Sequence, residues 1–150
     1  MNIVAIGAHY DDTELGCGGT LHKYSLAGHN TYGIVICIPD YNLRDAATAI
    51  REGSEAASII GYQPISLYKE TRRIEFTTDF VKEIEGHLKS LEADVILTHW
   101  LGDVHQDHSV VARTVISAAR HYPRILMFRT NCYRSTMDFR GNYYVPLTQD

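Results

Sequence analysis

The fold is decided at residues 3–12, which read IVAIGAHYDD. A short apolar run, Ile3–Ile6, is followed closely by one imidazole and two carboxylates, from His9, Asp11 and Asp12. Short runs rich in β-branched residues are typical of buried strands. We therefore expect a buried strand with three polar side chains after its carboxyl end.

A second segment repeats this arrangement further along the chain. The run from Asp94 to Leu97 leads into a loop that is rich in histidine and aspartate. Its candidate metal ligands are His99, Asp103, His105, Asp107 and His108. Two clusters with metal-ligand chemistry thus follow two separate candidate strands. This pairing indicates one metal site divided between two segments.

Five short apolar runs alternate with longer segments of helical period. The expected strands are Ile3–Ile6, Tyr32–Ile38, Ile65–Tyr68, Val95–Leu97 and Ile125–Phe128. The expected helices are a short one from Leu21 to Gly28, then Ala46 to Ile60, Asp79 to Leu91 and about His108 to His121. This alternation predicts an α/β fold, with a Rossmann-like, doubly wound, mostly parallel sheet and helices on both faces.

The strand order of such a sheet predicts where a ligand binds. In the order 3-2-1-4-5, the first and fourth strands are neighbours where the winding reverses, and ligands bind outside their carboxyl ends. The segment His9–Asp12 follows the first expected strand, and His99–His108 follows the fourth. Topology and residue types therefore indicate the same crevice.

Composition indicates one ordinary globular domain. The chain has 150 residues, 45% hydrophobic and 21% charged, which suits a single α/β domain over residues 1–150. No apolar run approaches the ~20 residues that span a bilayer, and the amino end lacks a signal-peptide pattern, so we expect a cytoplasmic protein.

Cys17, Cys37 and Cys132 are widely spaced, which argues against a disulfide framework or a thiolate zinc site. A net charge of −4, with Arg72-Arg73 as the only adjacent basic pair, argues against a nucleic-acid partner.

The residue types favour zinc over other ions. Two imidazoles and a carboxylate without a thiolate match a catalytic zinc site, whereas magnesium and calcium prefer oxygen ligands. Bound zinc lowers the pKa of water from 15.7 towards ~7 and polarises a carbonyl group, so hydrolysis of an amide or ester is expected. A neighbouring carboxylate would take the proton of the water, and a histidine would stabilise the oxyanion or protonate the leaving group.

Two motifs in this order resemble the LmbE-like, PIG-L-type zinc-dependent N-acetylglucosaminyl deacetylases. Residues 8–19, AHYDDTELGCGG, resemble the family's opening AHPDD(x)E(x)GCGG, and residues 103–108, DVHQDH, resemble its D-x-H-x-D-H segment. Residues 51–57, REGSEAA, together with Ile60-Gly61, are similar to a helix of the family. The likeness covers roughly residues 3–112. It implies removal of an acetyl group from an N-acetylated amino sugar or a glycoconjugate.

The resemblance also implies a role for each site residue. The zinc ligands that it implies are His9, Asp12 and His108. It makes Asp11 the general base and His105 the electrophilic or acid group, and it has Asp107 orient His105. Spacing alone leaves open which of the two adjacent carboxylates is the ligand.

Three further positions are candidates for substrate binding. Arg51 would position the substrate, and Tyr10, which replaces the family's usual proline, adds a phenol at the pocket edge. Trp100 either stacks on a sugar ring or covers the core. Gln106 replaces a second common proline.

The run Gly16–Gly19 lacks phosphate-loop spacing, so we expect it to allow close packing of a helix on a strand.

The family usually extends further than this sequence. We therefore expect its carboxyl-terminal part, and some of the pocket wall, to be missing after Asp150. A truncated chain, a natural short member and a homo-oligomer in which another subunit supplies the wall all stay open. The alternative function is a non-catalytic module that binds a sugar or nucleotide with a structural or lapsed metal site. The presence of Asp11 and His105 argues against it, because metal binding alone requires neither.

Overall fold

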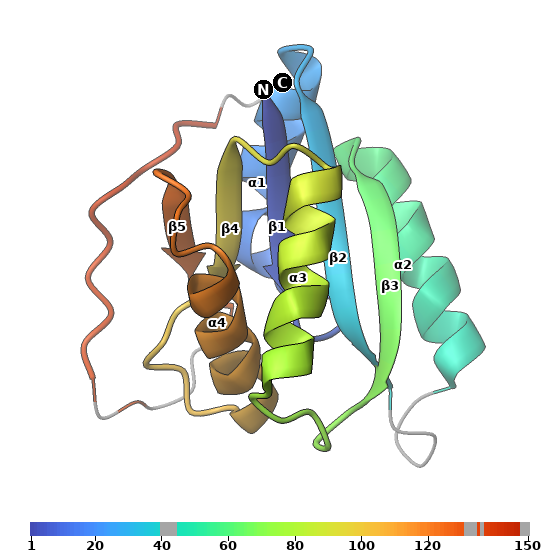
Figure 1. Ribbon diagram of the computed structural model, residues 1–150. Helices are drawn as coiled ribbons and strands as arrows, with labels where there is room; N and C mark the ends of the chain where they lie inside the picture. The colour runs from blue at the N-terminus through green and yellow to red at the C-terminus, as the bar shows by residue number, and fades with distance from the viewer. Residues whose placement is uncertain (40–44, 131–134, 136, 148–150) are drawn as a thin grey trace.

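A parallel sheet forms the centre of the molecule, and helices cover it (Figure 1). The computed structural model describes residues 1–39, 45–130, 135 and 137–147. The strands in these ranges are β1 (Asn2–Gly7), β2 (Asn30–Ile38), β3 (Gln63–Glu70), β4 (Val95–His99) and β5 (Ile125–Phe128). The helices are α1 (Asp12–Leu26), α2 (Ala46–Ile60), α3 (Thr78–Ser90) and α4 (Gln106–Ala118).

The strands lie in the order β3-β2-β1-β4-β5, and every pair is parallel. The predicted fold class and strand order are therefore confirmed. Ile6 of β1 lies opposite Ile34 of β2 on one side and Thr98 of β4 on the other. Because the winding reverses between β1 and β4, the turns after these two strands lie at the same edge of the sheet.

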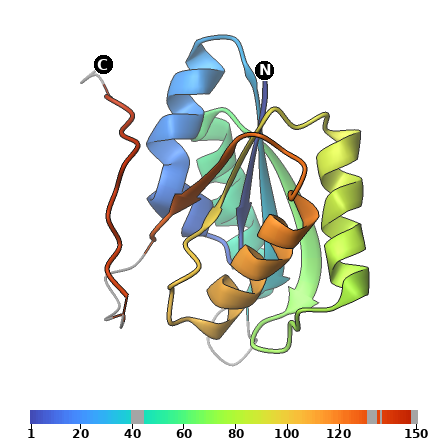
Figure 2. The same cartoon turned by 60° about the vertical axis from the view of Figure 1, so that its left-hand side comes forward.

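Helices cover both faces of the sheet, because the side chains of a strand alternate between faces (Figures 1 and 2). Val4 and Ile6 of β1 belong to a core cluster that α3 and α4 cover. Ile3 and Ala5 belong to a second cluster, which α1 and α2 cover. Both faces of β1 are thus buried, which explains its continuous apolar sequence.

The first helix is longer than its apolar pattern predicts. The predicted helix ran from Leu21 to Gly28, but α1 begins at Asp12, directly after the turn that follows β1. The prediction was wrong because the first half of α1 contains the Gly16–Gly19 run, which has no apolar stripe to indicate a helix. Its first turn carries two acidic residues, Asp12 and Glu14, which suit the positive end of the helix dipole.

The glycines of α1 allow other elements to approach the helix closely. A Cβ at Gly16 would overlap the ring of Phe128 in β5, and a Cβ at Gly18 would lie 3.2 Å from Ile60 of α2. The prediction that this run allows close packing of a helix on a strand is confirmed for Gly16, whereas Gly18 faces another helix.

The other helices follow their predicted ranges within three residues. α2 spans the predicted residues, and the Asp45 side chain caps it by accepting the Thr48 backbone N–H at 2.8 Å. It ends at Gly61, whose φ of 90° is the left-handed conformation that favours glycine. α3 and α4 begin one and two residues earlier than predicted.

Residues 137–147 follow an extended path beside α1 (Figure 2). Lys23 Nζ donates to the carbonyl oxygen of Pro146 at 2.7 Å, and Leu147 packs over Gly19. Cys17 and Cys37 are buried free thiols, while Cys132 lies outside the described residues.

No helix in the described parts of the chain has the length and apolar character that a bilayer span requires.

Candidate metal centre

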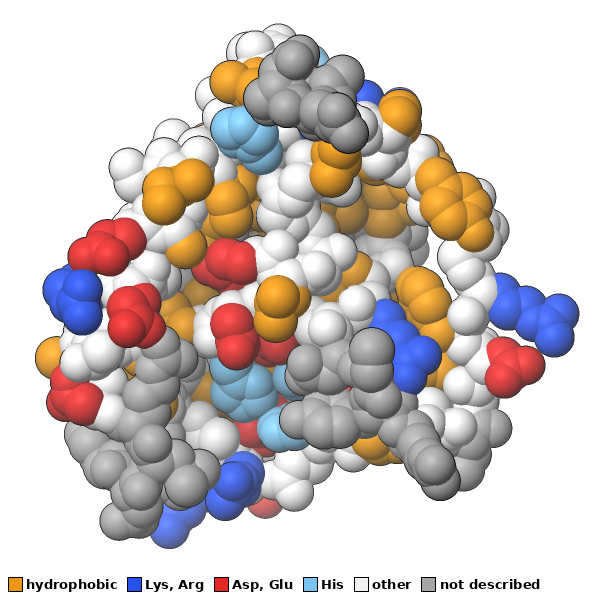
Figure 3. Space-filling view, turned by 180° about the vertical axis from the view of Figure 1, so that it is seen from behind, with side chains coloured by type: hydrophobic (Ala, Val, Ile, Leu, Met, Phe, Trp, Pro, Cys, Tyr) orange, Lys and Arg blue, Asp and Glu red, His pale blue; other side chains and the backbone are white. Residues whose placement is uncertain are grey.

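The turns after β1 and β4 bring the two predicted polar clusters into contact. Nε2 of His9 lies 2.9 Å from Oδ2 of Asp107, and Nε2 of His108 lies 3.2 Å from Oδ1 of Asp12. Histidine side chains adjoin acidic ones in the space-filling view (Figure 3). Residues from distant parts of the sequence therefore meet at the carboxyl edge of the sheet, where the topology predicts a ligand site.

The Asp12 carboxylate contacts two imidazoles in this cluster, those of His9 and His108. The Asp12 carboxylate lies 3.4 Å from Nδ1 of His9 through Oδ2 and 3.2 Å from Nε2 of His108 through Oδ1. Ligands of tetrahedral zinc, bound at about 2.0–2.2 Å, lie about 3.3 Å from each other. The donor types and these two distances therefore suit zinc. Among the described residues, the groups whose ligand atoms all lie within 4.8 Å of one another are His9, His105 and His108; Asp12, His99 and His108; and His9, Cys37 and Asp107.

A carboxylate also contacts the remaining nitrogen of each of these imidazoles. Nε2 of His9 lies 2.9 Å from Asp107, and Nδ1 of His108 lies 3.0 Å from Oδ2 of Asp103. Carboxylates in this position orient histidine ligands and raise their basicity. They leave Nδ1 of His9 and Nε2 of His108 directed at Asp12.

His99, which the two motifs do not include, also lies in this cluster. It ends β4, is fully buried, and places Nε2 3.2 Å from Oδ2 of Asp12. The same Nε2 accepts the backbone N–H of Ala8 at 3.0 Å, and the ring stacks on His108 with 4.0 Å between centroids. Because Ala8 already engages the Nε2 lone pair, His99 is a poorer ligand than His9. The sequence named His99 among the candidate ligands after the fourth strand, although the family motifs give it no role.

Asp107 contacts different groups from those that the resemblance implies. Its carboxylate contacts His9 and accepts the backbone N–H of Arg72 at 2.9 Å. Its own backbone N–H donates to Nδ1 of His105 at 3.2 Å, because His105 caps the start of α4. Nδ1 is then an acceptor, so neutral His105 carries its hydrogen on Nε2. The backbone of Asp107 thus sets this tautomer.

Arg72 contacts the cluster through its backbone N–H group, and no pattern of side chains in the sequence could predict this contact. Its φ of 65° is left-handed, and this turn directs its N–H at Asp107. Nε2 of Gln106 donates to the Arg72 carbonyl oxygen at 3.0 Å. The glutamine that replaces a common proline therefore ties the start of α4 to the loop after β3.

Neighbouring side chains fix the charges of the cluster. Burial alone would raise the pKa of Asp12, but its contacts with the side chains of His108, His9 and His99 hold this pKa well below its usual range. Burial alone would lower the pKa of His9, but the Asp107 and Asp12 carboxylates raise it to about 9. The cluster therefore stabilises positive charge, either a proton or a cation, between its carboxylates.

Asp11 directly precedes Asp12, and His105 lies beside His9 and His108. Asp11 is exposed and is the N-cap residue of α1, with a φ of 116°. The ring of His105 lies 5.0 Å from that of His9, centroid to centroid. Burial, together with the charges of His108 and His9, lowers the pKa of His105. His105 is therefore neutral near pH 7 and can donate a hydrogen bond from Nε2.

The three predicted substrate-binding residues have different surroundings. Arg51 forms an ion pair with Glu55 at 3.0 Å on the exposed side of α2. Trp100 contacts the ring of Phe139. Tyr10 is only 9% exposed, which differs from the expected phenol at a pocket edge.

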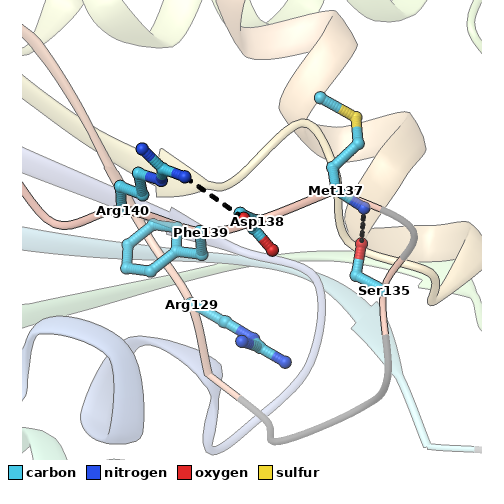
Figure 4. Close-up of a pocket in the computed structure, with 6 residues that line it drawn as sticks. All are labelled: Arg129, Ser135, Met137, Asp138, Phe139 and Arg140. Atoms are coloured by element: carbon cyan, nitrogen blue, oxygen red, sulfur yellow. Dashed lines mark hydrogen bonds and ion pairs between the residues drawn. The ribbon is translucent and has the colours of Figure 1, made fainter.

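A pocket adjoins the loop that follows β4 (Figure 4). Its lining residues are Arg129, Ser135, Met137, Asp138, Phe139 and Arg140. Phe139 contacts Trp100, and Oγ of Ser135 donates to the carbonyl oxygen of Gly102 at 2.7 Å. Two lining residues of the pocket thus contact the loop between His99 and His105. The lining combines an aromatic ring with charged groups.

The fold and the site together define an α/β protein with a histidine–aspartate candidate metal centre at the switch point of its sheet. The sequence matches the family described as PIG-L: GlcNAc-PI de-N-acetylase over residues 4–119, and the chain belongs to this family. It is 32% identical over 135 residues to the uncharacterized deacetylase YaiS of Escherichia coli (strain K12). That match covers 85% of this chain and 73% of YaiS.

Two solved structures share the fold. The conserved protein TT1542 from Thermus thermophilus has a TM-score of 0.74 and 22% identity, over 84% of this chain and 65% of its own. The N,N'-diacetylchitobiose deacetylase from Pyrococcus horikoshii, complexed with its inhibitor MPG, has a TM-score of 0.72 and 22% identity. That match covers 79% of this chain and 49% of the deacetylase. The chain therefore spans about two thirds of the first protein and about half of the second.

Proposed function

We propose that this protein is a zinc-dependent hydrolase that removes the acetyl group from an N-acetylated amino sugar of the N-acetylglucosamine type, free or in a glycoconjugate. The main support is that the Asp12 carboxylate lies 3.4 Å from Nδ1 of His9 and 3.2 Å from Nε2 of His108. Family membership supports deacetylation. The shared fold of a diacetylchitobiose deacetylase supports an amino sugar as the substrate.

In this proposal, the zinc ligands are His9 through Nδ1, Asp12 through its carboxylate and His108 through Nε2. Zinc at this position would polarise the acetyl carbonyl and lower the pKa of a water molecule. Asp107 and Asp103 orient the two imidazoles through the hydrogen bonds described above.

The remaining steps belong to side chains of the chain itself. Asp11 removes a proton from the attacking water as its oxygen adds to the acetyl carbon. His105 donates a hydrogen bond from Nε2 to the carbonyl oxygen as negative charge develops there. The carbon–nitrogen bond then breaks, the amine takes up a proton, and the products are acetate and the free amino sugar.

Trp100 and Phe139 are proposed to contact the sugar ring, because Phe139 lines the pocket of Figure 4 and its ring contacts that of Trp100. Arg51 is proposed to position the substrate through its exposed guanidinium group. Its existing ion pair with Glu55 is a surface contact of the kind that contributes little energy and exchanges readily.

The first test measures metal content and acetate release. The purified chain should bind one equivalent of zinc and release acetate from N-acetylglucosamine derivatives, including N,N'-diacetylchitobiose. Chelation should abolish the release, and added zinc should restore it. A chain that binds no zinc and releases no acetate would support the non-catalytic module instead.

A pair of adjacent substitutions tests the assigned roles. Asp11→Asn should keep zinc bound while turnover falls by ~10²–10⁴, the usual contribution of a general base. Asp12→Asn should lose zinc, because a neutral amide is a weak ligand. If Asp11→Asn loses the metal and Asp12→Asn keeps it, the two roles are reversed.

A further inference from the structure

We propose that Tyr10 is a positioning residue, which anchors the turn His9–Asp12 to α2 and β3 and so sets the direction of the Asp11 carboxylate. The inference rests on the proposed function, in which Asp11 is the general base. The contacts of Tyr10 with Gly53 of α2 and Ser66 of β3 are called the Tyr10 anchor below.

The Tyr10 side chain is buried inside the protein. It forms a small buried cluster with Val35 of β2 and Ala49 of α2. Its hydroxyl group lies 2.7 Å from Oγ of Ser66, which gives this polar group a partner. The ring and the hydroxyl group thus contact three elements of the fold.

Gly53 leaves the space that the Tyr10 ring occupies. It is a buried residue within α2, and a Cβ at this position would overlap Cδ1 of the ring. A glycine inside a helix costs up to about 1 kcal/mol relative to alanine, so its presence needs a packing reason. The reason here is contact between the helix backbone and the Tyr10 ring.

The neighbouring residue His9 fastens the same turn in a different direction. Its imidazole contacts Asp107 of α4, on the face of the sheet that α3 and α4 cover. Tyr10 instead contacts α2, which lies on the other face with α1. Two consecutive side chains therefore tie the turn to helices on opposite faces.

Asp11 needs such support because its backbone is strained. Its φ of 116° lies in the region that side chains other than glycine rarely adopt. A strained residue keeps its conformation only where the surrounding structure holds it. Tyrosine leaves its own φ free, unlike proline, so contacts of the side chain must hold the turn. The Tyr10 anchor supplies them one residue before Asp11.

Tyr10→Phe tests the hydrogen-bonded part of the anchor. We expect kcat to fall about 3- to 10-fold, as the loss of one neutral hydrogen bond implies, while KM and zinc content stay at wild-type values. A role in stability alone would lower the melting temperature and leave kcat per folded molecule unchanged. That outcome would overturn the proposal.

Gly53→Ala tests the ring contact, and Gly86→Ala is its matched control. A Cβ at Gly53 displaces the Tyr10 ring, so kcat should fall, whereas Gly86 lies in α3 with no atom within 4 Å of an added Cβ and should leave kcat unchanged. In a Tyr10→Ala background, Gly53→Ala should change kcat by less than about twofold, because the clashing ring is gone. An equal loss of kcat in both backgrounds would contradict the anchor.

Hydrogen exchange separates this proposal from the proposed function. The Leu15 backbone N–H donates to the Asp11 carbonyl oxygen at 2.9 Å, so its exchange rate reports on the turn without any substrate. Tyr10→Phe should speed exchange of Leu15 and leave Leu88 of α3 unchanged. A wild-type chain that releases no acetate refutes the proposed function, whereas unchanged exchange at Leu15 refutes the anchor.

Discussion

Nδ1 of His108 lies 3.0 Å from Oδ2 of Asp103, five residues earlier in the chain. The first turn of α4 thus carries a candidate ligand, and the loop before this helix carries the carboxylate that orients it. Because the hydrogen of His108 is held on Nδ1, Nε2 is left with a lone pair that faces Asp12. The orientation of this ring is therefore set by the protein itself.

Replacing Asp103 should weaken zinc binding without removing a ligand. We expect Asp103→Ala to lower zinc affinity by about 10- to 100-fold, the usual effect of losing a carboxylate that orients a histidine ligand. A competition titration against a chelator measures this change. Asp79→Ala, at an exposed position in the first turn of α3, should leave zinc affinity unchanged.

The proposed set of zinc ligands includes His9 and not His99. His9→Gln should abolish stoichiometric zinc binding, because Nδ1 of His9 is directed at Asp12. His99→Gln should retain zinc, since the glutamine can still accept the Ala8 N–H that Nε2 of His99 accepts now. Metal analysis of both purified variants decides the matter. Zinc loss in the His99 variant alone would assign the ligand set Asp12, His99 and His108 instead.

The raised pKa of His9 predicts how the stability of the metal-free protein depends on pH. Its pKa is about 9 in the folded chain and 6.5 in an unfolded one. A raised pKa gives stability that is complete below pH 6.5 and is lost as the pH rises through about 9. The free energy of unfolding should therefore fall by up to about 3 kcal/mol over this range. Urea denaturation at several pH values measures it, and His9→Gln should reduce the decrease.

The contact between α1 and β5 predicts opposite effects for two glycine substitutions. Gly16→Ala should destabilise the protein by about 1–3 kcal/mol, because the added Cβ overlaps the Phe128 ring in a packed core. Gly86→Ala should stabilise it by up to about 1 kcal/mol, because alanine favours the helix and an added Cβ there meets no neighbour. Thermal denaturation compares the two, and stabilisation by both would show that Phe128 moves aside.

Local sequence patterns were sufficient for the sheet and for the location of the site. The apolar runs are continuous because both faces of strands such as β1 are buried, and the Gly61 signal for the end of α2 is a local backbone requirement. The strand order also predicts that the segments containing His9 and His105 lie at the same edge of the sheet. These features depend on residues that are close together in the sequence or on a general rule of topology.

Features that depend on contacts between distant residues could not be predicted. The partner of the Asp107 carboxylate is His9, which follows β1, and the N–H that it accepts belongs to Arg72, which follows β3. The direction of the Tyr10 ring depends on a gap at Gly53. Each of these contacts exists only once the helices have packed on the sheet, so neither spacing nor residue type reveals it.

The pairing of β1 with β4 also has a consequence for the order of folding. Ile3 lies opposite Val95, so the crevice closes only after a long intervening segment has been made and folded. Contacts between residues so far apart in sequence form late, because the entropy of closing the intervening chain must be overcome first. During synthesis at the ribosome, His9 and Asp12 emerge well before His108. If the proposed ligands bind zinc, complete metal binding requires the native pairing of β1 with β4.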